Sequence, residues 1–195
     1  MCNEISEKLI RKKLRKYQEK TNSGKSNHRI QAAVLLPLYC DENEWHLIFT
    51  RRSETVEDHK GQVSFPGGAS DHTDENLVAT ALREAQEEIG LDPKSVVILG
   101  KMEALPTISN FQVTPIVGML NEWPAKFDLS PHEVSRVFSI PLKWLADRSN
   151  VETRPYRLPN GKTEAVYFFQ PFDDELLWGL TARITLDFIK IIMEK

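Results

Sequence analysis

The chain has 195 residues, which is the size of one domain with at most a small extension. Hydrophobic residues make up 41% and charged residues 27%, so the chain can bury a sizeable core and does not have a disordered composition. A formal net charge of -3 argues against a basic nucleic-acid-binding protein. The longest apolar stretch, Ala32 to Cys40, is too short to span a bilayer, and the first residues are polar. We expect a soluble cytoplasmic protein with no membrane or nucleic-acid partner.

The N-terminal segment differs in charge from the rest of the chain. Residues 1–30 contain nine Lys and Arg against three Glu, and apolar residues recur at nearly helical spacing from Ile5 to Leu14. This pattern predicts a basic amphipathic helix up to about Glu19, followed by a loop over 21–27. Such an arm can contact an anionic surface or partner, but a solvated helix packed on the domain edge is the preferred interpretation. We divide the chain into a basic helix and loop, residues 1–29, and one α/β domain, residues 30–195.

Strand-like and helical segments alternate from Ile30 onward. Short β-branched or apolar runs predict strands at Ala32–Leu38, His46–Thr50, Val96–Leu99, Val113–Met119 and Ala165–Phe169. Apolar periodicity predicts helices at Leu77–Ile89 and Leu176–Met193. Asn160-Gly161 marks a hairpin turn before the last strand.

The helix at Leu77–Ile89 has an unusual distribution of charge. Thr73 or Asp74 can cap its start, and Gly90 stands where a left-handed C-cap glycine belongs. The last two turns hold Glu84, Glu87 and Glu88, although the helix dipole favours cations there. Glu84 and Glu88 are also four residues apart, so like charges meet on one side of the helix.

A divalent cation would remove both penalties. Mg²⁺ and similar hard cations prefer carboxylate oxygens and keep several waters, which leaves room for phosphate groups of a substrate. Arg83 can pair with Glu87 one turn later and fix its rotamer. Upstream, Gly67 and Gly68 form a tight loop whose backbone can approach an anion or support the helix. A solvated acidic helix face is the alternative, but the combination of loop, carboxylates and C-cap favours a metal site.

This segment resembles the Nudix hydrolases, whose box reads G-x5-E-x7-R-E-U-x-E-E-x-G-U, with U a bulky aliphatic residue. Two positions depart from the box: Ala69 replaces the leading glycine and Ala85 the aliphatic residue. The residues in register are Glu75, Arg83, Glu84, Glu87, Glu88, Gly90 and Leu91. The resemblance implies an α/β/α sandwich around a mixed β-sheet, preceded here by the N-terminal helix, and Mg²⁺ or Mn²⁺ as cofactor.

The preceding stretch, Phe49–Ser53 and His59–Gly68, resembles the signature of coenzyme A pyrophosphatases within that superfamily. Glu57 stands where that signature usually has an arginine. Further matches lie in Phe111–Pro115 and Trp178–Ala182. The resemblance implies a hydrolase that cleaves coenzyme A, or a derivative, at its pyrophosphate to 3′,5′-ADP and 4′-phosphopantetheine.

Hydrolysis of a pyrophosphate needs metal ions, cationic partners and a positioned water. We expect Glu84 and Glu88 to be the main metal ligands, with Glu87 as a further ligand or as the residue that orients the water. The general base is Glu87 or a carboxylate from elsewhere, for which Glu133 is the candidate because family members often use a loop glutamate near there. A first-turn acid of a helix after Pro131 is the alternative for Glu133.

Cationic side chains upstream of the box are candidates for the substrate's phosphates. Arg51, Arg52 and Lys60 could each bind phosphate oxygens, or could be surface charges beside a strand end. The lone histidines His59 and His72 fit polar loop residues better than zinc ligands. Cys2 and Cys40 are interpreted as plain thiols, which suits a reducing compartment. The aromatic residues Tyr167, Phe168, Phe169 and Trp178 are assigned to the core.

Two other functions stay open. One is a Nudix pyrophosphatase for ADP-ribose, NADH or nucleoside triphosphates. Pro106, fifteen residues past Leu91, resembles the ADP-ribose group in its placement. The other is a nucleotide-sensing Nudix domain without turnover, against which the intact carboxylates argue. The small-molecule substrate is the expected partner, with a homodimer possible.

Overall fold

The computed structural model describes residues 2, 5–20, 29–55, 60–157 and 161–194. Its helices are α1 (Glu7–Lys20), α2 (Leu77–Ile89), α3 (Leu142–Ala146) and α4 (Gly179–Met193), with short 3₁₀ turns η1 (Pro93–Ser95) and η2 (Arg148–Asn150). Its strands are β1 (Ile30–Asp41), β2 (Glu44–Arg52), β3 (Val63–Ser64), β4 (Gly67–Ala69), β5 (Val96–Lys101), β6 (Leu105–Pro106), β7 (Phe111–Leu120), β8 (Val134–Pro141), β9 (Val151–Arg157) and β10 (Thr163–Phe169).

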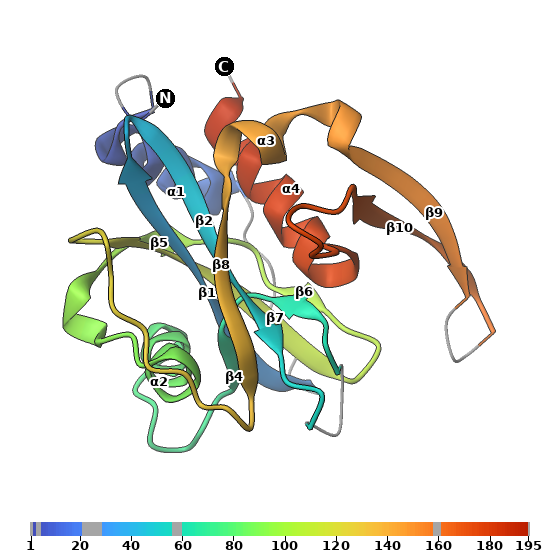
Figure 1. The fold of residues 1–195 in the computed structure, drawn as a ribbon, viewed down its shortest axis with the longest axis horizontal. Helices are drawn as coiled ribbons and strands as arrows, with labels where there is room; N and C mark the ends of the chain where they lie inside the picture. The colour runs from blue at the N-terminus through green and yellow to red at the C-terminus, as the bar shows by residue number, and fades with distance from the viewer. Residues whose placement is uncertain (1, 3–4, 21–28, 56–59, 158–160, 195) are drawn as a thin grey trace.

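A mixed eight-stranded sheet forms the centre of the molecule (Figure 1). Its main path runs β3-β2-β1-β7-β5, with β4 paired to β1, β6 to β7 and β8 to β2. Strands β1 and β7 are parallel, in register from Ile30 opposite Phe111 to Leu38 opposite Met119. The other pairs in this sheet are antiparallel. Strands β9 and β10 form a separate antiparallel hairpin.

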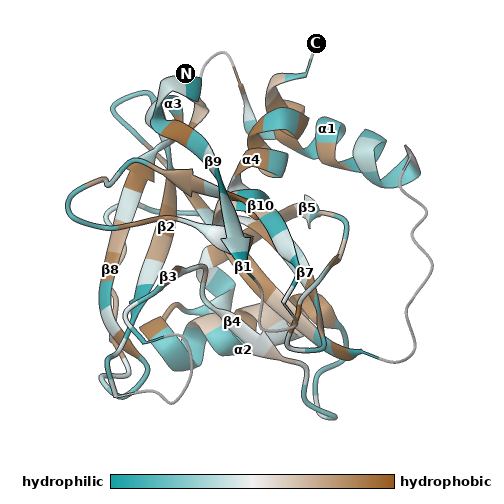
Figure 2. Cartoon of the chain, turned by 90° about the vertical axis from the view of Figure 1, so that its right-hand side faces the viewer, coloured by the Kyte–Doolittle hydropathy of each residue, from teal (hydrophilic) through white to brown (hydrophobic). Residues whose placement is uncertain are grey.

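Helices cover both faces of the sheet. Figure 2 shows α2 on one side and α1 and α4 on the other. Successive side chains of β1 alternate between these two sides, because neighbouring residues of a strand point to opposite faces. Ala33 and Leu35 pack with α2, whereas Leu36 and Leu38 pack in the core that α1 and α4 share. This arrangement confirms the predicted α/β/α sandwich around a mixed sheet.

The N-terminal helix is part of this second core. Ile10 and Leu14 of α1 are fully buried, and α1 packs against β5 and α4. The structure therefore packs the basic amphipathic helix on the domain, as the preferred interpretation expected. No helix of the described residues is long and apolar enough to cross a membrane.

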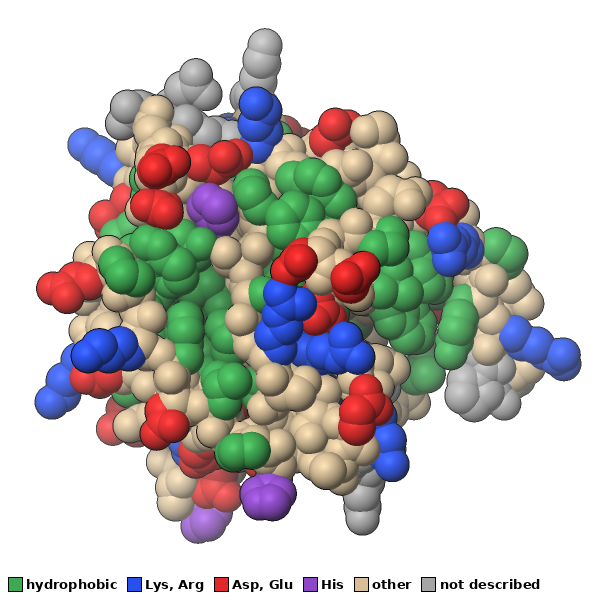
Figure 3. Space-filling view, viewed as in Figure 1, with side chains coloured by type: hydrophobic (Ala, Val, Ile, Leu, Met, Phe, Trp, Pro, Cys, Tyr) green, Lys and Arg blue, Asp and Glu red, His purple; other side chains and the backbone are tan. Residues whose placement is uncertain are grey.

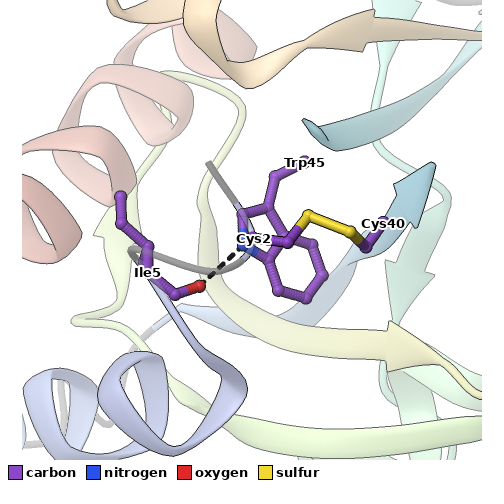
Figure 4. The surroundings of a disulfide bond; sticks show 4 residues. All are labelled: Cys2, Ile5, Cys40 and Trp45. Atoms are coloured by element: carbon purple, nitrogen blue, oxygen red, sulfur yellow. Dashed lines mark hydrogen bonds between the residues drawn. A yellow bond between two sulfur atoms is a disulfide. The ribbon is translucent and has the colours of Figure 1, made fainter. Parts of the chain in front are cut away.

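The expectation of two plain thiols is wrong, because Cys2 and Cys40 form a disulfide (Figure 4). Two hydrogen bonds hold the same region together: Cys2 N donates to Asn43 O at 3.1 Å, and Trp45 Nε1 donates to Ile5 O at 2.7 Å. The sequence missed the pair because the cysteines are 38 residues apart, and only folding brings the chain start to the end of β1. Cysteine usage therefore gives no argument for a reducing compartment.

The assignment of four aromatic residues to the core is confirmed for Phe169, which is 1% exposed, and for Tyr167, which packs against the same core. Tyr167, Phe168 and Trp178 are only partly buried. Phe168 lies on the separate β9–β10 hairpin and Trp178 is the N-cap of α4, so these two rings lie outside the main core. The predicted turn at Asn160-Gly161 lies partly outside the described residues, as do Glu57 and His59.

Candidate active site

Helix α2 has the predicted bounds but a different N-terminal cap. Asn76 Oδ1 accepts hydrogen bonds from the backbone N–H groups of Val78 (2.9 Å) and Ala79 (3.1 Å), so Asn76 is the N-cap. Neither Thr73 nor Asp74 caps the helix; Asp74 instead accepts hydrogen bonds from Thr80 and Arg83. At the other end Gly90 has the expected left-handed conformation, with φ of 67°.

Small residues bring α2 close to the sheet. Ala81 and Ala85 are completely buried, each 0% exposed, in the core between α2 and β1. On the next face of the helix the Glu84 carboxylate lies over Gly68, where an added Cβ would be 2.5 Å from Glu84 Oε2. An added Cβ at Gly67 would lie 2.3 Å from Ala33 O. The glycine pair is therefore what allows strand β4 to fit between β1 and the acidic face of α2.

A cavity of about 400 Å³ opens at this point. Its lining residues come from separate parts of the chain: Arg52, Thr55, Gly67, Gly68, Glu84, Glu88 and Glu133. The structure thus brings together two of the predicted metal ligands, the glycine pair, one predicted arginine and the candidate base. Thr55 lines the cavity too, and no pattern in the sequence distinguished it.

Glu88 lies at the buried side of this cavity and is 5% exposed. Burial raises the pKa of its carboxyl to about 8, while the nearby Arg52 guanidinium and the Gly67 N–H oppose that rise. Gly67 N donates to Glu88 Oε2 at 3.3 Å, and Arg52 Nη1 lies 3.9 Å from Glu88 Oε1. Burial also raises the pKa of Glu84. A bound cation would favour the ionised form of both side chains.

Arg83 connects α2 to the loop before it. Its guanidinium donates to Asp74 Oδ1 (2.9 Å), Glu84 Oε1 (2.8 Å) and Glu87 Oε2 (3.0 Å), which confirms the predicted contact with Glu87. It also donates to Ala69 O at 3.1 Å. Arg83 therefore holds the carboxylate of Glu84 and the β4 backbone in fixed positions. Asp74 was missed as its partner, because nine residues separate the two and the helix period does not relate them.

Glu87 and Glu133 occupy different positions relative to the cavity. Glu87 is exposed, pairs with Arg83 and does not line the cavity. Glu133 is exposed as well but lines it, from a turn that leads directly into β8 rather than from a helix. The turn is held to β2 by Ser53 N, which donates to Glu133 O at 2.8 Å.

Of the three cationic residues predicted to bind phosphate, only Arg52 lines the cavity. Arg51 and Arg52 are neighbours at the end of β2, so their side chains point to opposite faces. Arg52 lines the cavity, whereas Arg51 Nη1 lies 3.4 Å from the buried carboxylate of Glu175, away from it. Lys60 is exposed and does not line this cavity. Among the described side chains, Arg52 Nε is buried without a hydrogen-bond partner, so it can donate to an anion.

The carboxylates suit a hard cation, although no three His, Cys, Asp or Glu side chains of the described residues are grouped closely enough to hold a metal ion. Glu84 and Glu88 supply carboxylate oxygens at the cavity wall, and oxygen ligands are those that Mg²⁺ and Mn²⁺ prefer. His72, whose imidazole is exposed beside Asp71, lies outside the cavity.

Comparison with known proteins agrees with this geometry. The NUDIX domain model matches residues 29–159. The chain belongs to the NUDIX domain family. An "Uncharacterized Nudix hydrolase NudL" from Pectobacterium atrosepticum is 40% identical over 156 residues, covering 79% of this chain and 78% of the relative. The protein of the same name from Yersinia enterocolitica is 39% identical over 183 residues, covering 92% and 89%.

Solved Nudix structures share the fold at low identity. A NUDIX hydrolase from Alicyclobacillus acidocaldarius has a TM-score of 0.51 at 17% identity, covering 85% of this chain and 93% of its own. A MutT/nudix family protein from Enterococcus faecalis has a TM-score of 0.52 at 11% identity, covering 92% and 73%. These structures show the fold alone. The family model and the curated relatives make the chain a Nudix hydrolase, a class of enzyme that generally uses divalent metal ions.

Proposed function

We propose that this Nudix hydrolase cleaves the pyrophosphate bond of coenzyme A or its derivatives, giving 3′,5′-ADP and 4′-phosphopantetheine or its acyl form. The observation that carries the proposal is the convergence of two stretches on one cavity. The segment that resembles the coenzyme A pyrophosphatase signature supplies Arg52, Gly67 and Gly68, and α2 supplies Glu84 and Glu88.

Glu84 and Glu88 are the proposed ligands of Mg²⁺ or Mn²⁺, with Glu87 as a further ligand or the residue that orients the water. When bound, the metal would neutralise phosphate charge and lower the pKa of a water molecule. Arg83 holds Glu84 and Glu87 through the hydrogen bonds described above and is a positioning residue. The buried environment of Glu88 keeps its carboxyl protonated in the metal-free protein near neutral pH, so metal binding should release a proton.

Two residues are proposed to act directly on the substrate. Arg52 Nε, buried and unpaired among the described atoms, can donate to a phosphate oxygen while its guanidinium stays near Glu88. Glu133 is the proposed general base, because it is exposed and lines the same cavity as Glu84 and Glu88 but comes from a different segment of the chain. Arg51 and Lys60 are not proposed as phosphate ligands, since neither lines the cavity.

A substrate panel tests the proposal. Coenzyme A, ADP-ribose, NADH and dGTP are supplied side by side, each with Mg²⁺ and with Mn²⁺, and the products are identified by chromatography. We expect release of 3′,5′-ADP from coenzyme A with a kcat/KM well above that for the others. A higher kcat/KM for ADP-ribose would keep the family and overturn the substrate. Metal binding without any turnover would favour the nucleotide-sensing alternative.

A further inference from the structure

A groove of about 520 Å³ adjoins the carboxylate cavity. Arg52 and Gly67 line both spaces, so the groove begins where the proposed reaction takes place. A substrate bound across the carboxylates therefore has room to extend one of its two halves into the groove. Its size falls within the range typical of small-molecule sites.

Three segments that lie far apart in the sequence form the walls of this groove. The loop after β6 contributes Ile108, the β9–β10 hairpin contributes Tyr156, and the start of α4 contributes Trp178. The Trp178 ring lies 5.6 Å from the Tyr156 ring and 5.4 Å from the Phe168 ring, centroid to centroid. Figure 3 shows hydrophobic side chains gathered beside the hairpin and the start of α4.

The chemistry of the lining is mainly apolar and aromatic. Besides the residues above, the apolar lining residues include Val34, Phe65, Val113, Leu180 and Ile184. Charged side chains are few: Arg52 stands at the cavity end, and Arg183 is paired with Asp187, Nε to Oδ2, at 2.8 Å. Hydroxyl groups of Ser64 and Ser109 also line the groove. Such a lining favours an uncharged, flexible ligand over a phosphorylated one.

We propose that the groove binds the uncharged pantetheine arm of the substrate and the acyl chain attached to it, and so selects acylated coenzyme A. This inference rests on the proposed function. Of the two halves of coenzyme A, the 3′,5′-ADP half carries two charged phosphates. The arginines that line the groove are Arg52, which stands at the cavity end, and Arg183, which is already paired with Asp187. The pantetheine arm is uncharged: it has two amides, a hydroxyl and a dimethyl-substituted carbon, and it ends in a thiol or an acyl thioester. These groups match the hydroxyls and apolar side chains of the walls.

The proposal is tested by the binding of the two product halves, which needs no turnover. Ile108 is 68% exposed on the groove wall, so Ile108→Asn changes the lining without threatening the fold. Ile30→Asn is the matched control, since Ile30 is also exposed, at 50%, and does not line the groove. Binding of S-octanoyl-4′-phosphopantetheine and of 3′,5′-ADP is measured by titration calorimetry on all three proteins.

We expect Ile108→Asn to weaken S-octanoyl-4′-phosphopantetheine about tenfold and to leave 3′,5′-ADP unchanged, whereas Ile30→Asn affects neither. In the wild-type protein, each methylene of the acyl chain buried in the groove should strengthen binding up to about fourfold. Loss of 3′,5′-ADP affinity in Ile108→Asn would place the nucleotide in the groove and overturn the proposal. So would equal affinities in all three proteins.

A second variant guards against a misleading result at one position. Trp178→Ala removes a ring that is only partly buried, and Leu176→Ala, at a residue 39% exposed in the same loop and outside the groove, is its control. The ratio of kcat/KM for octanoyl-coenzyme A to that for coenzyme A should fall in Trp178→Ala alone. An unchanged ratio would contradict the groove assignment. The proposed function is tested by a different observation: if the wild-type protein released no 3′,5′-ADP from coenzyme A, the proposed function itself would fail.

Discussion

The buried Glu88 carboxyl links the chemistry of the cavity to the stability of the protein. Burial penalises the charged form and raises the pKa of this carboxyl from its ordinary value of 4.5 to about 8 in the folded state. Since the folded state holds this proton more tightly than the unfolded state, the contribution is stabilising below about pH 4.5 and is lost as the pH rises toward 8. The residue that the proposed reaction needs is therefore a cost to the metal-free fold at neutral pH.

We predict that Glu88→Gln removes this pH dependence. With a chelator present, the wild-type protein should lose stability relative to the variant as the pH rises from 5 to 8. The free energy of unfolding of the variant minus that of the wild type should therefore increase over this range. The slope of that difference can reach about 1.4 kcal/mol per pH unit, the value for a difference of one bound proton between the folded and unfolded states. Urea denaturation at several pH values measures it. Parallel pH profiles for the two proteins would show that Glu88 ionises normally.

The two loop glycines should respond differently to the same substitution. In Gly68→Ala the atoms nearest to the new Cβ are those of the Glu84 carboxylate, with Oε2 at 2.5 Å, so Glu84 must turn away while the fold adjusts. We predict at least about a tenfold loss of kcat, equivalent to 1.4 kcal/mol, with little change in Tm. Assays of kcat and thermal unfolding measure both quantities.

Gly67→Ala is the comparison for that experiment. Here the Cβ meets backbone, 2.3 Å from Ala33 O and 2.6 Å from Val34 Cα, which cannot move without disturbing β1. We expect a clear loss of Tm in this variant. If Gly68→Ala also lost stability while keeping its kcat, the placement of Glu84 over Gly68 would be wrong.

At the scale of single elements, α2 shows what a sequence can and cannot specify. The three- and four-residue recurrence of apolar residues predicted its bounds, Leu77–Ile89, because one face of the helix is buried against the sheet. The cap was wrongly placed, because Thr73, Asp74 and Asn76 are all acceptable caps and only the path of the loop decides among them.

Two of the elements not predicted from the sequence, β9 and α3, lack a strong local signal. Strand β9 (Val151–Arg157) is polar, contains Pro155 and is exposed over most of its length, so no buried face imposes alternation on it. Helix α3 has five residues, which is too short for periodicity to show. For the site, the box gave Glu84 and Glu88 directly. The partners Arg52, Thr55 and Glu133 meet them only through tertiary folding.

We predict that Asn76→Ala destabilises the protein by about 1 kcal/mol, because two N–H groups of the first helical turn lose their acceptor. Thr73→Ala is the matched control: Thr73 is exposed and bonds only to Asp71 among the contacts described. Denaturant unfolding measures both variants. A larger effect at Thr73 than at Asn76 would restore the cap expected from the sequence.

At the scale of the whole molecule, the disulfide joins the chain start to the sheet. The Cys2–Cys40 bond closes a stretch of 38 residues that includes α1, whose Ile10 and Leu14 are fully buried. Loss of this link gives the unfolded chain more freedom and leaves α1 held by packing and by hydrogen bonds such as that from Gln18 Nε2 to Lys101 O, at 2.6 Å.

We predict that a reductant lowers the free energy of unfolding by about 2–4 kcal/mol. The Cys40→Ser variant should show the lower stability from the outset and no further response to reductant. Chemical denaturation with and without dithiothreitol measures the effect. Identical stability of the wild-type protein under both conditions would show that the bond does not form in solution.

We propose that carboxylates on α2, in a cavity shared with Arg52 and Glu133, bind the metal with which this protein hydrolyses the pyrophosphate of coenzyme A. The most direct measurement is the rate of 3′,5′-ADP release from coenzyme A, with Mg²⁺ or Mn²⁺, by the wild-type protein and by Glu88→Gln. We predict release by the wild-type protein and a fall in kcat of at least about 100-fold in the folded variant, since a metal ligand contributes several kcal/mol. Equal rates in the two proteins, or no 3′,5′-ADP from the wild-type protein, would contradict the claim.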